Sequence, residues 1–189
     1  RGFGRFLPKT NHFEGFRYDH SSLKQDWYND FAFTPNGDVF LGFWGGPGLM
    51  IFQHEKAAFG EILNSKLSDE QAKLITALHR DNNKLWIGTS NRGLICYDID
   101  QDTAISYFTE TNPSGGIDVD LIYDIATDSL GNIWTAANGL LKYDARNDRF
   151  ERVKSSTHFH QIQIFKIGVG SHNILWLLTS KGLMKYDPG

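Results

Sequence analysis

Apolar residues fall in short runs along the chain, and one kind of run recurs at nearly constant spacing. Each copy contains a large aromatic residue, with 46, 48 and 42 residues between successive copies: Phe40, Trp86, Trp134 and Trp176. A Gly-apolar pair follows in every copy, and a second aromatic lies four residues after that glycine: Phe52, Tyr97, Tyr143 and Tyr186. A repeat of this length is one structural unit that must pack against its neighbours to bury an apolar face.

The pattern within each copy predicts short β-strands. An apolar run precedes the first aromatic, and the turn between them contains residues that tolerate positive φ, as in Pro35-Asn36-Gly37. A further apolar run follows the second aromatic: Phe13 to Phe16, Ile105 to Phe108 and Phe150 to Val153. Four strands in about 45 residues form one blade of a β-propeller. We therefore interpret the eight recurring aromatics as core side chains that fill the space between blades.

The same repeat divides the chain into blades. Residues 1–17 fit the second half of a preceding blade, because Gly2 and Phe6 have the spacing of the later Gly-aromatic pairs. Three blades and a last one without its fourth strand follow, at residues 18–64, 65–109, 110–154 and 155–189. The predicted fold is all-β, with about four repeats of four antiparallel strands in an open arc or a fragment of a larger propeller. Exposed strand edges at the ends of such an arc favour aggregation unless they are covered.

Composition narrows the range of functions. Lys plus Arg number 19 against 22 for Asp plus Glu, and neither sign forms a long run, which argues against binding of nucleic acid or a membrane surface. Cys96 is the single cysteine, so it forms no internal disulfide, and we expect it to be a small buried apolar residue. Without an 18-residue apolar window or a signal-peptide core, the chain as given is expected to be soluble.

Two of the copies contain sequence motifs that resemble those of a known repeat. One copy has Gly-Asn-Ile-Trp at 131–134 and Gly-Leu-Leu-Lys-Tyr-Asp at 139–144. The other copy has Asn-Lys-Leu-Trp-Ile-Gly-Thr-Ser at 83–90 and Gly-Leu-Ile-Cys-Tyr-Asp at 93–98. Both resemble the two-component-regulator propeller repeat. That repeat builds the periplasmic sensor region of hybrid two-component histidine kinases in Bacteroides-type bacteria.

The resemblance implies a function and a location. It implies a non-catalytic, periplasmic sensor segment that binds an oligosaccharide or similar small ligand and signals to a kinase and transcription regulator outside this chain. It also implies the remaining blades of a seven-bladed propeller as partners, a homodimer of the full-length sensor, no direct contact with nucleic acid and no cofactor.

Ligand-binding residues are expected where the copies differ, in the loops of one face. The connection from Phe43 to Gly48 is the longest of its kind and contains an extra indole, Trp44, which could stack on the apolar face of a sugar ring. Packing of Trp44 against a neighbouring loop is the alternative. Further candidates on the corresponding loops supply stacking surfaces and hydrogen-bonding groups: Trp27, Tyr28, Arg92, Tyr123, His158 and His160.

Catalysis and metal binding receive little support from the sequence. His158 and His160 lie on one side of a strand, but no third ligand is identifiable nearby, so no metal site is predicted. Asp128 lies one position early for a sialidase Asp-box, and Asp30 and Asp124 are carboxylates that could face the channel without a nucleophile beside them. The alternatives left open are a propeller lyase or glycoside hydrolase, and a protein-interaction or spacer propeller.

Overall fold

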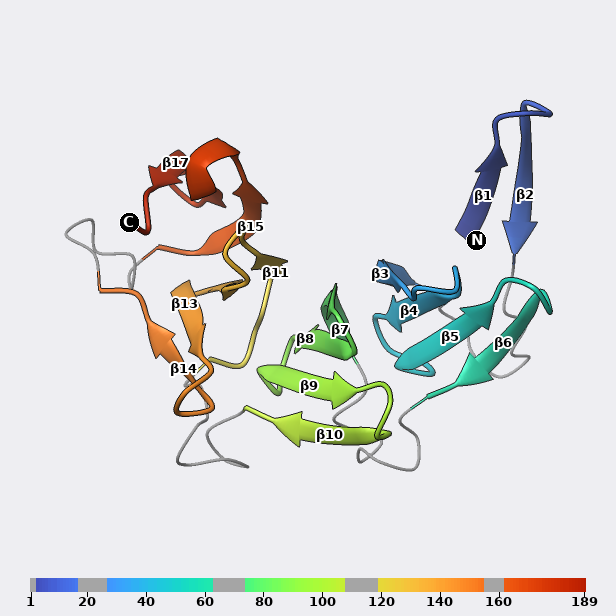
Figure 1. Cartoon of the computed structure of the whole chain (residues 1–189), viewed down its shortest axis with the longest axis horizontal. Helices are drawn as coiled ribbons and strands as arrows, with labels where there is room; N and C mark the ends of the chain where they lie inside the picture. Colours follow the sequence, from blue (N-terminus) through green and yellow to red (C-terminus); the bar gives the residue numbers. More distant parts are fainter. Residues whose placement is uncertain (1–2, 17–26, 63–73, 108–118, 155–161) are drawn as a thin grey trace.

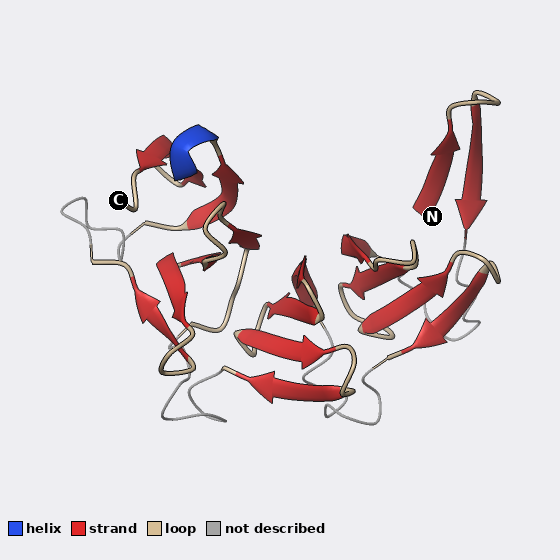
Figure 2. Cartoon of the chain, in the orientation of Figure 1, coloured by secondary structure: helices blue, strands red, loops and turns tan. Residues whose placement is uncertain are grey.

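The computed structural model describes residues 3–16, 27–62, 74–107, 119–154 and 162–189. It confirms the predicted all-β class with four-stranded antiparallel sheets. The sheets follow one another along an arc, and the N-terminal hairpin lies across the open side from the C-terminal sheet (Figure 1). Within the described ranges almost all of the regular structure is strand, apart from one short 3₁₀ turn, η2 (Ser171–Asn173) (Figure 2).

Each sheet is a meander of neighbouring strands. The hairpin contains β1 (Phe3–Leu7) and β2 (His12–Phe16). Sheet I contains β3 (Tyr28–Phe33), β4 (Val39–Phe43), β5 (Leu49–Gln53) and β6 (Ala58–Glu61). Sheet II contains β7 (Ile75–Asp81), β8 (Lys84–Thr89), β9 (Leu94–Asp98) and β10 (Thr103–Ser106). Sheet III contains β11 (Asp124–Thr127), β12 (Ile133–Ala137), β13 (Gly139–Asp144) and β14 (Arg149–Arg152). Sheet IV contains β15 (Ile164–Val169), β16 (Leu175–Thr179) and β17 (Gly182–Tyr186).

The predicted blade boundaries stay predictions. The junctions at 17/18, 64/65 and 109/110 lie outside the described residues, and the junction at 154/155 lies at the edge of them. The sheets themselves begin and end inside the predicted blades.

The recurring aromatics of the second strands lie between sheets. Phe40, Trp86 and Trp134 are each 1% exposed and face the next sheet along the chain. Trp176 has the same position in β16 but is 43% exposed. The expectation that Trp176 is a buried core residue is therefore wrong, because no described sheet packs on that face of sheet IV.

Close approach of neighbouring sheets depends on small residues beside these aromatics. A Cβ at Gly42 would lie 2.5 Å from Cγ2 of Ile75 in the next sheet, and a Cβ at Gly88 would lie 2.7 Å from Cγ2 of Ile122. Both distances are shorter than real carbon contacts. Glycine at these positions therefore allows the first strand of sheet II, and the segment that leads into the first strand of sheet III, to pack directly on the second strand of the preceding sheet.

Aspartates in the turns after the third strands hold tyrosine side chains. The Tyr97 hydroxyl donates to Asp102 Oδ1 at 2.9 Å, and the Tyr143 hydroxyl donates to Asp148 Oδ1 at 2.6 Å. Both aspartates have positive φ, 52° and 49°. Tyr107, which enters from the end of sheet II, also donates to Asp148, so this carboxylate links two sheets.

Candidate functional site

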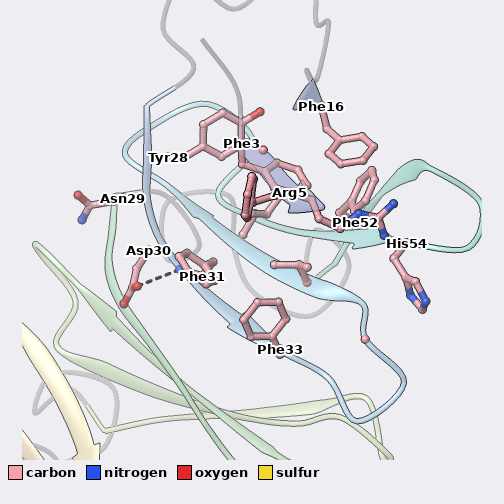
Figure 3. A pocket seen from close by; sticks show the side chains of 15 residues that line it. Phe3, Arg5, Phe16, Tyr28, Asn29, Asp30, Phe31, Phe33, Phe52 and His54 are labelled. Atoms are coloured by element: carbon pink, nitrogen blue, oxygen red, sulfur yellow. Dashed lines mark hydrogen bonds between the residues drawn. The ribbon is translucent and has the colours of Figure 1, made fainter. Parts of the chain in front are cut away.

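An aromatic cleft of about 560 Å³ lies between the N-terminal hairpin and sheet I (Figure 3). We define it by the residues that line it: Phe3, Gly4, Arg5, Phe6, Phe16, Tyr28, Asn29, Asp30, Phe31, Phe33, Gly37, Val39, Leu41, Phe52 and His54. Cavities of several hundred Å³ with aromatic walls and a few polar groups are typical binding sites for small molecules. The cleft is therefore the strongest candidate site among the described residues.

One wall of the aromatic cleft is a tightly packed ring cluster. The Phe52 ring lies 4.9 Å from the ring of Phe3 and 4.4 Å from that of Phe16. This cluster ties the hairpin to sheet I. On another side, Phe31 and Phe33 form an edge-to-face pair with ring centroids 5.5 Å apart, and they are 56% and 59% exposed. These two rings are open to a ligand without any rearrangement of the packed cluster.

Polar groups at the rim of the cleft are held in defined orientations. Asp30 Oδ1 accepts a hydrogen bond from the Phe31 backbone at 2.9 Å (Figure 3). Asp38, below His54, accepts from the backbone N and from Nδ1 of His54 at 2.9 and 3.1 Å. Burial alone would raise the pKa of Asp38, but the hydrogen bonds from His54 and Asn36 outweigh it and lower that pKa. Asp38 is therefore an anion at neutral pH that orients the imidazole of His54.

The structure brings three of the predicted ligand residues together. Tyr28 lines the cleft. Trp27 and Trp44 lie beside it at the end of sheet I where β3 begins and β4 ends, with the Trp44 backbone N donating to Trp27 O at 2.8 Å. The two indoles are 54% and 39% exposed. Of the two alternatives for Trp44, this partial exposure leaves room for stacking on a ligand.

The other predicted ligand residues lie elsewhere. Arg92 lies in the turn between β8 and β9, where its backbone N donates to Thr89 Oγ1 at 2.9 Å. Tyr123 precedes β11, and its ring packs edge-on against Phe165 of sheet IV at 5.2 Å. His158 and His160 lie outside the described residues. The described members of the predicted set are thus spread along the arc rather than gathered at one point.

Several cleft residues were missed at the sequence level. The sequence predicts Phe31 and Phe33 only as part of an apolar first strand, although their alternation with Ala32 already places both rings on one face. Arg5 and His54 have no signal in the sequence, because Arg5 reaches the cleft only when the hairpin packs against sheet I, and His54 is oriented by Asp38, which is 16 residues away in the chain.

The carboxylates that could suggest catalysis are engaged in structural hydrogen bonds. Asp30 Oδ2 accepts from the Leu78 backbone and Asp124 Oδ2 from the Ile167 backbone, each at 2.8 Å, so both link the first strands of adjacent sheets. Asp124 also pairs with Lys166 at 2.8 Å. These contacts favour a joining role for both carboxylates over a role in acid–base chemistry.

Asp128, the Asp-box-like residue, organises a turn. Its carboxylate accepts from the backbone N of Leu130 and Asn132 and from Trp134 Nε1, at 2.9, 2.9 and 2.8 Å. Asn173 of sheet IV donates to it as well, at 3.2 Å. Burial would raise the pKa of Asp128, but these hydrogen bonds, with Trp134 foremost, lower it. A carboxyl with a lowered pKa is a poor general acid at neutral pH.

The part of the chain that the structure describes holds neither a metal-like cluster nor a membrane-spanning helix. No group of three or more His, Cys, Asp or Glu side chains there has the arrangement of a metal site. No helix there is long and apolar enough to span a membrane.

The sheets and their order define this chain as a stretch of β-propeller, and solved structures match it closely in fold. One is an extracellular domain of Bacteroides thetaiotaomicron described as a hybrid two-component system: the TM-score is 0.76, the identity is 19%, and the match covers 99% of this chain and 24% of that one. A second such domain from the same organism has a TM-score of 0.75, 17% identity and coverages of 98% and 25%. This chain thus spans about a quarter of those ectodomains.

An enzyme shares the fold as well. Virginiamycin B lyase from Staphylococcus aureus matches with a TM-score of 0.65 and 13% identity, over 95% of this chain and 61% of the lyase. No family profile and no curated protein sequence matches the chain. At these identities the matches establish the propeller fold, and function has to be argued from the site.

Proposed function

We propose that this chain is part of the extracytoplasmic sensor propeller of a hybrid two-component system, located in the periplasm, and that it binds a glycan fragment without transforming it. The aromatic cleft carries this proposal, because it combines exposed rings with a few oriented polar groups. The fold shared with two sensor ectodomains supports it. The kinase and the remaining blades belong to parts of the sensor outside this chain, and the full-length sensor forms a homodimer in this proposal.

The cleft suits a sugar ring. The exposed faces of Phe31 and Phe33 can stack on the apolar C–H face of a pyranose, with a contribution of about 1 kcal/mol per ring. At the rim, His54 is held through Nδ1 by Asp38 and offers its other ring nitrogen to a hydroxyl group. Asn29 and Asp30 bond to sheet II, and their side-chain oxygens offer acceptors beside those contacts. A ligand bound between the hairpin and sheet I would stabilise the packing of these two elements. Binding would thereby shift the position of the hairpin relative to sheet I.

Calorimetric titration with oligosaccharides from plant and host polysaccharides tests the proposal. We expect saturable heat with one of them, a weakening of at least about tenfold in Phe31→Ala and Phe33→Ala, and no change in a control, Ile105→Ala, which removes an exposed side chain from sheet II. Conversion of the oligosaccharide into product would support the lyase or hydrolase alternative instead. Binding that is equal in all variants would place the ligand elsewhere.

One observation favours the spacer or protein-interaction alternative. The register of β1 with β2 pairs Phe6 with Phe13, just as β5 with β6 pairs Phe52 with Phe59. The hairpin thus matches the third and fourth strands of a blade, and the cleft lies where the first and second strands would pack. If the full ectodomain showed no heat with any glycan while this chain did, the cleft would be a packing surface for strands.

A further inference from the structure

Neighbouring sheets are linked by carboxylates at their first strands, which lie on the concave side of the arc (Figure 1). Asp30 of β3 accepts a hydrogen bond from the Leu78 backbone N of β7 at 2.8 Å. Asp124 of β11 accepts one from the Ile167 backbone N of β15, also at 2.8 Å. Sheets I and II are thus linked in the same way as sheets III and IV, and the junction between sheets II and III can be compared with both.

The junction of sheets II and III lacks this link in the described part of the chain, because Ala77 has the register that Asp30 has in its own sheet. The donor concerned is the Ile125 backbone N, which has the register of Leu78 in the next sheet. Hydrogen-bonded and non-hydrogen-bonded pairs alternate along an antiparallel ladder, so residues of equal register point their N–H groups to the same edge. The Ile125 N–H therefore faces the concave edge and receives no carboxylate from sheet II.

A second contact of the first strands differs at the same junction. Asn29, the bulge residue of β3, donates through Nδ2 to the carbonyls of Ile75 and Thr76 at 3.1 and 3.0 Å. The bulge residue of β7 is Thr76 itself. Its Oγ1 is buried and has no hydrogen-bond partner among the described residues. Bulges often direct side chains toward binding sites, and a buried hydroxyl without a partner calls for one.

We call this position the unlinked edge and define it by Thr76, Ala77 and Ile125. Here sheet II has two small side chains at the positions where sheet I has an amide and a carboxylate. A group that fills the unlinked edge as Asn29 and Asp30 fill the first junction needs two features. It has to offer a donor to the main-chain carbonyls just before β11 and an acceptor to the Ile125 N–H.

The charges around the unlinked edge favour a neutral group. Asp30 and Asp124 belong to the junctions on either side of it, and Lys166 pairs with Asp124 at 2.8 Å. Burial would lower the pKa of Lys166, but the hydrogen bond and charge of Asp124 and the charge of Asp30 raise it, so these carboxylates already balance the ammonium. A further carboxylate would be repelled by the two aspartates. An amide offers a donor and an acceptor without a net charge.

We propose that the unlinked edge binds the acetamido group of an N-acetylated amino sugar. The carbonyl accepts from the Ile125 N–H, the amide N–H donates to the carbonyls just before β11, and Thr76 supplies a hydroxyl beside them. The proposal rests on the glycan-binding function proposed above and assigns the ligand a second position, apart from the aromatic cleft. Because the concave side of the arc is the channel of a propeller, this position stays open to solvent when further blades complete the ring.

Titration with N,N′-diacetylchitobiose tests the proposal, with cellobiose, which has hydroxyl groups in place of the acetamido groups, as the matched sugar. We expect saturable heat with the first and binding at least about tenfold weaker with the second. Without ligand, the Ile125 amide should exchange its hydrogen faster than the amides of Leu78 and Ile167, because it lacks their carboxylate acceptor. Diacetylchitobiose should shift the Ile125 amide signal and slow this exchange.

Ala77→Asp supplies the carboxylate from sheet II itself. We expect it to weaken binding of diacetylchitobiose at least about tenfold and to slow exchange of the Ile125 amide. Ala58→Asp, which adds the same charge at an exposed position of β6, should change neither. If Ala77→Asp failed to fold, the two sugars and the exchange of the three amides in the wild-type chain would still decide.

Four results would overturn the proposal. Two of them are equal affinity for both disaccharides and an Ile125 amide that is as protected as those of Leu78 and Ile167 in the free chain. Equal binding of an N-acetylated tripeptide would show that the edge recognises any amide. A loss of binding in Phe31→Ala but not in Ala77→Asp would place the sugar in the aromatic cleft, which keeps the proposed function and removes this site. Heat with no oligosaccharide at all would contradict the proposed function itself, and this site with it.

Discussion

At the scale of single residues, Trp86 and Trp134 occupy equivalent positions but have different hydrogen bonds. Trp134 Nε1 donates to Asp128, whereas Trp86 Nε1 is buried with no partner in the described part of the chain. Replacement by phenylalanine removes the same volume from both. Because a hydrogen bond to a charged group contributes roughly 1.5–3 kcal/mol, we expect Trp134→Phe to lower the free energy of unfolding by about 1–2 kcal/mol more than Trp86→Phe. Urea unfolding measures this, and equal losses would contradict it.

Asp148 predicts a pH dependence at the same scale. Hydrogen bonds from Tyr107 and Tyr143 hold the pKa of Asp148 below its usual value, against the smaller effect of burial. A depressed folded pKa stabilises the fold above the unfolded value of about 3.9, and this stabilisation is lost as the pH falls through the folded pKa. Since Asp148 is exposed, we expect Asp148→Asn to cost about 1 kcal/mol at pH 7 and to flatten the acid limb of the stability profile.

The control for Asp148 is Asp100→Asn, which changes an exposed carboxylate in the corresponding turn of sheet II. Thermal melts between pH 2 and 7 compare the three proteins. If the acid limb of Asp148→Asn were as steep as that of the wild type, the shared tyrosine contact would contribute nothing in solution.

These residue-level roles were only partly predictable from the sequence. The spacing of the aromatics identifies Phe40, Trp86 and Trp134 as equivalent, because each gap between neighbouring blades is filled by the same kind of side chain. Trp176 is exposed because no sheet of the described residues packs on that face of sheet IV, which the local pattern of β16 does not reveal. The partner of Asp148 was missed for a similar reason, since Tyr107 comes from another sheet.

At the scale of elements, the glycines of the second strands make a direct prediction. Gly88→Ala would force a Cβ to within 2.7 Å of Ile122, so the two sheets would have to separate. Overpacking of this kind costs about 1–3 kcal/mol. The matched control is Gly15→Ala in β2, where no atom lies within 4 Å of an added Cβ. Chemical unfolding of both variants checks the prediction, and a neutral Gly88→Ala would contradict the close packing.

Strand order was predictable from the repeat, whereas strand ends were less so. The expected strand at Ile105 to Phe108 is found as β10 at Thr103–Ser106, and Phe108 lies outside the described residues. The Tyr107 backbone N still donates to Leu94 O of β9 at 2.8 Å, while its ring packs on Trp86 at 5.8 Å. In the sequence, an apolar residue that packs between this sheet and the next one cannot be distinguished from a residue that continues the strand. Local periodicity cannot separate these two kinds of burial.

At the scale of the whole molecule, an arc of blades followed from the repeat count, but the aromatic cleft did not. Its walls come from the hairpin and from sheet I, and its shape depends on which strands of a blade are present beside sheet I. Loop position and side-chain chemistry predict the ligand residues from the sequence. These two criteria bring Trp27, Tyr28 and Trp44 together but do not reveal that Tyr123 packs at a different junction.

The arc also predicts how stability is distributed. Each interior sheet packs on its two neighbours through separate clusters, with Trp86 between sheets II and III and Trp134 between sheets III and IV. In such an arrangement stability is a sum of local and nearest-neighbour contributions. We therefore expect Trp86→Ala, with a cost of about 3–5 kcal/mol at its own junction, to accelerate amide exchange in β8, β9, β12 and β13.

The amides of β16 should keep most of their protection in Trp86→Ala, because the Trp134 cluster that covers sheet IV is untouched. Native-state hydrogen exchange resolved by strand measures this, with Ile105→Ala as a control that removes an exposed side chain from sheet II. A uniform loss of protection from β3 to β17 would mean that the sheets unfold as one cooperative unit, and the nearest-neighbour description would then be wrong. A loss confined to sheets II and III would show that each junction is stabilised by its own aromatic, as the burial of Phe40, Trp86 and Trp134 at successive interfaces implies.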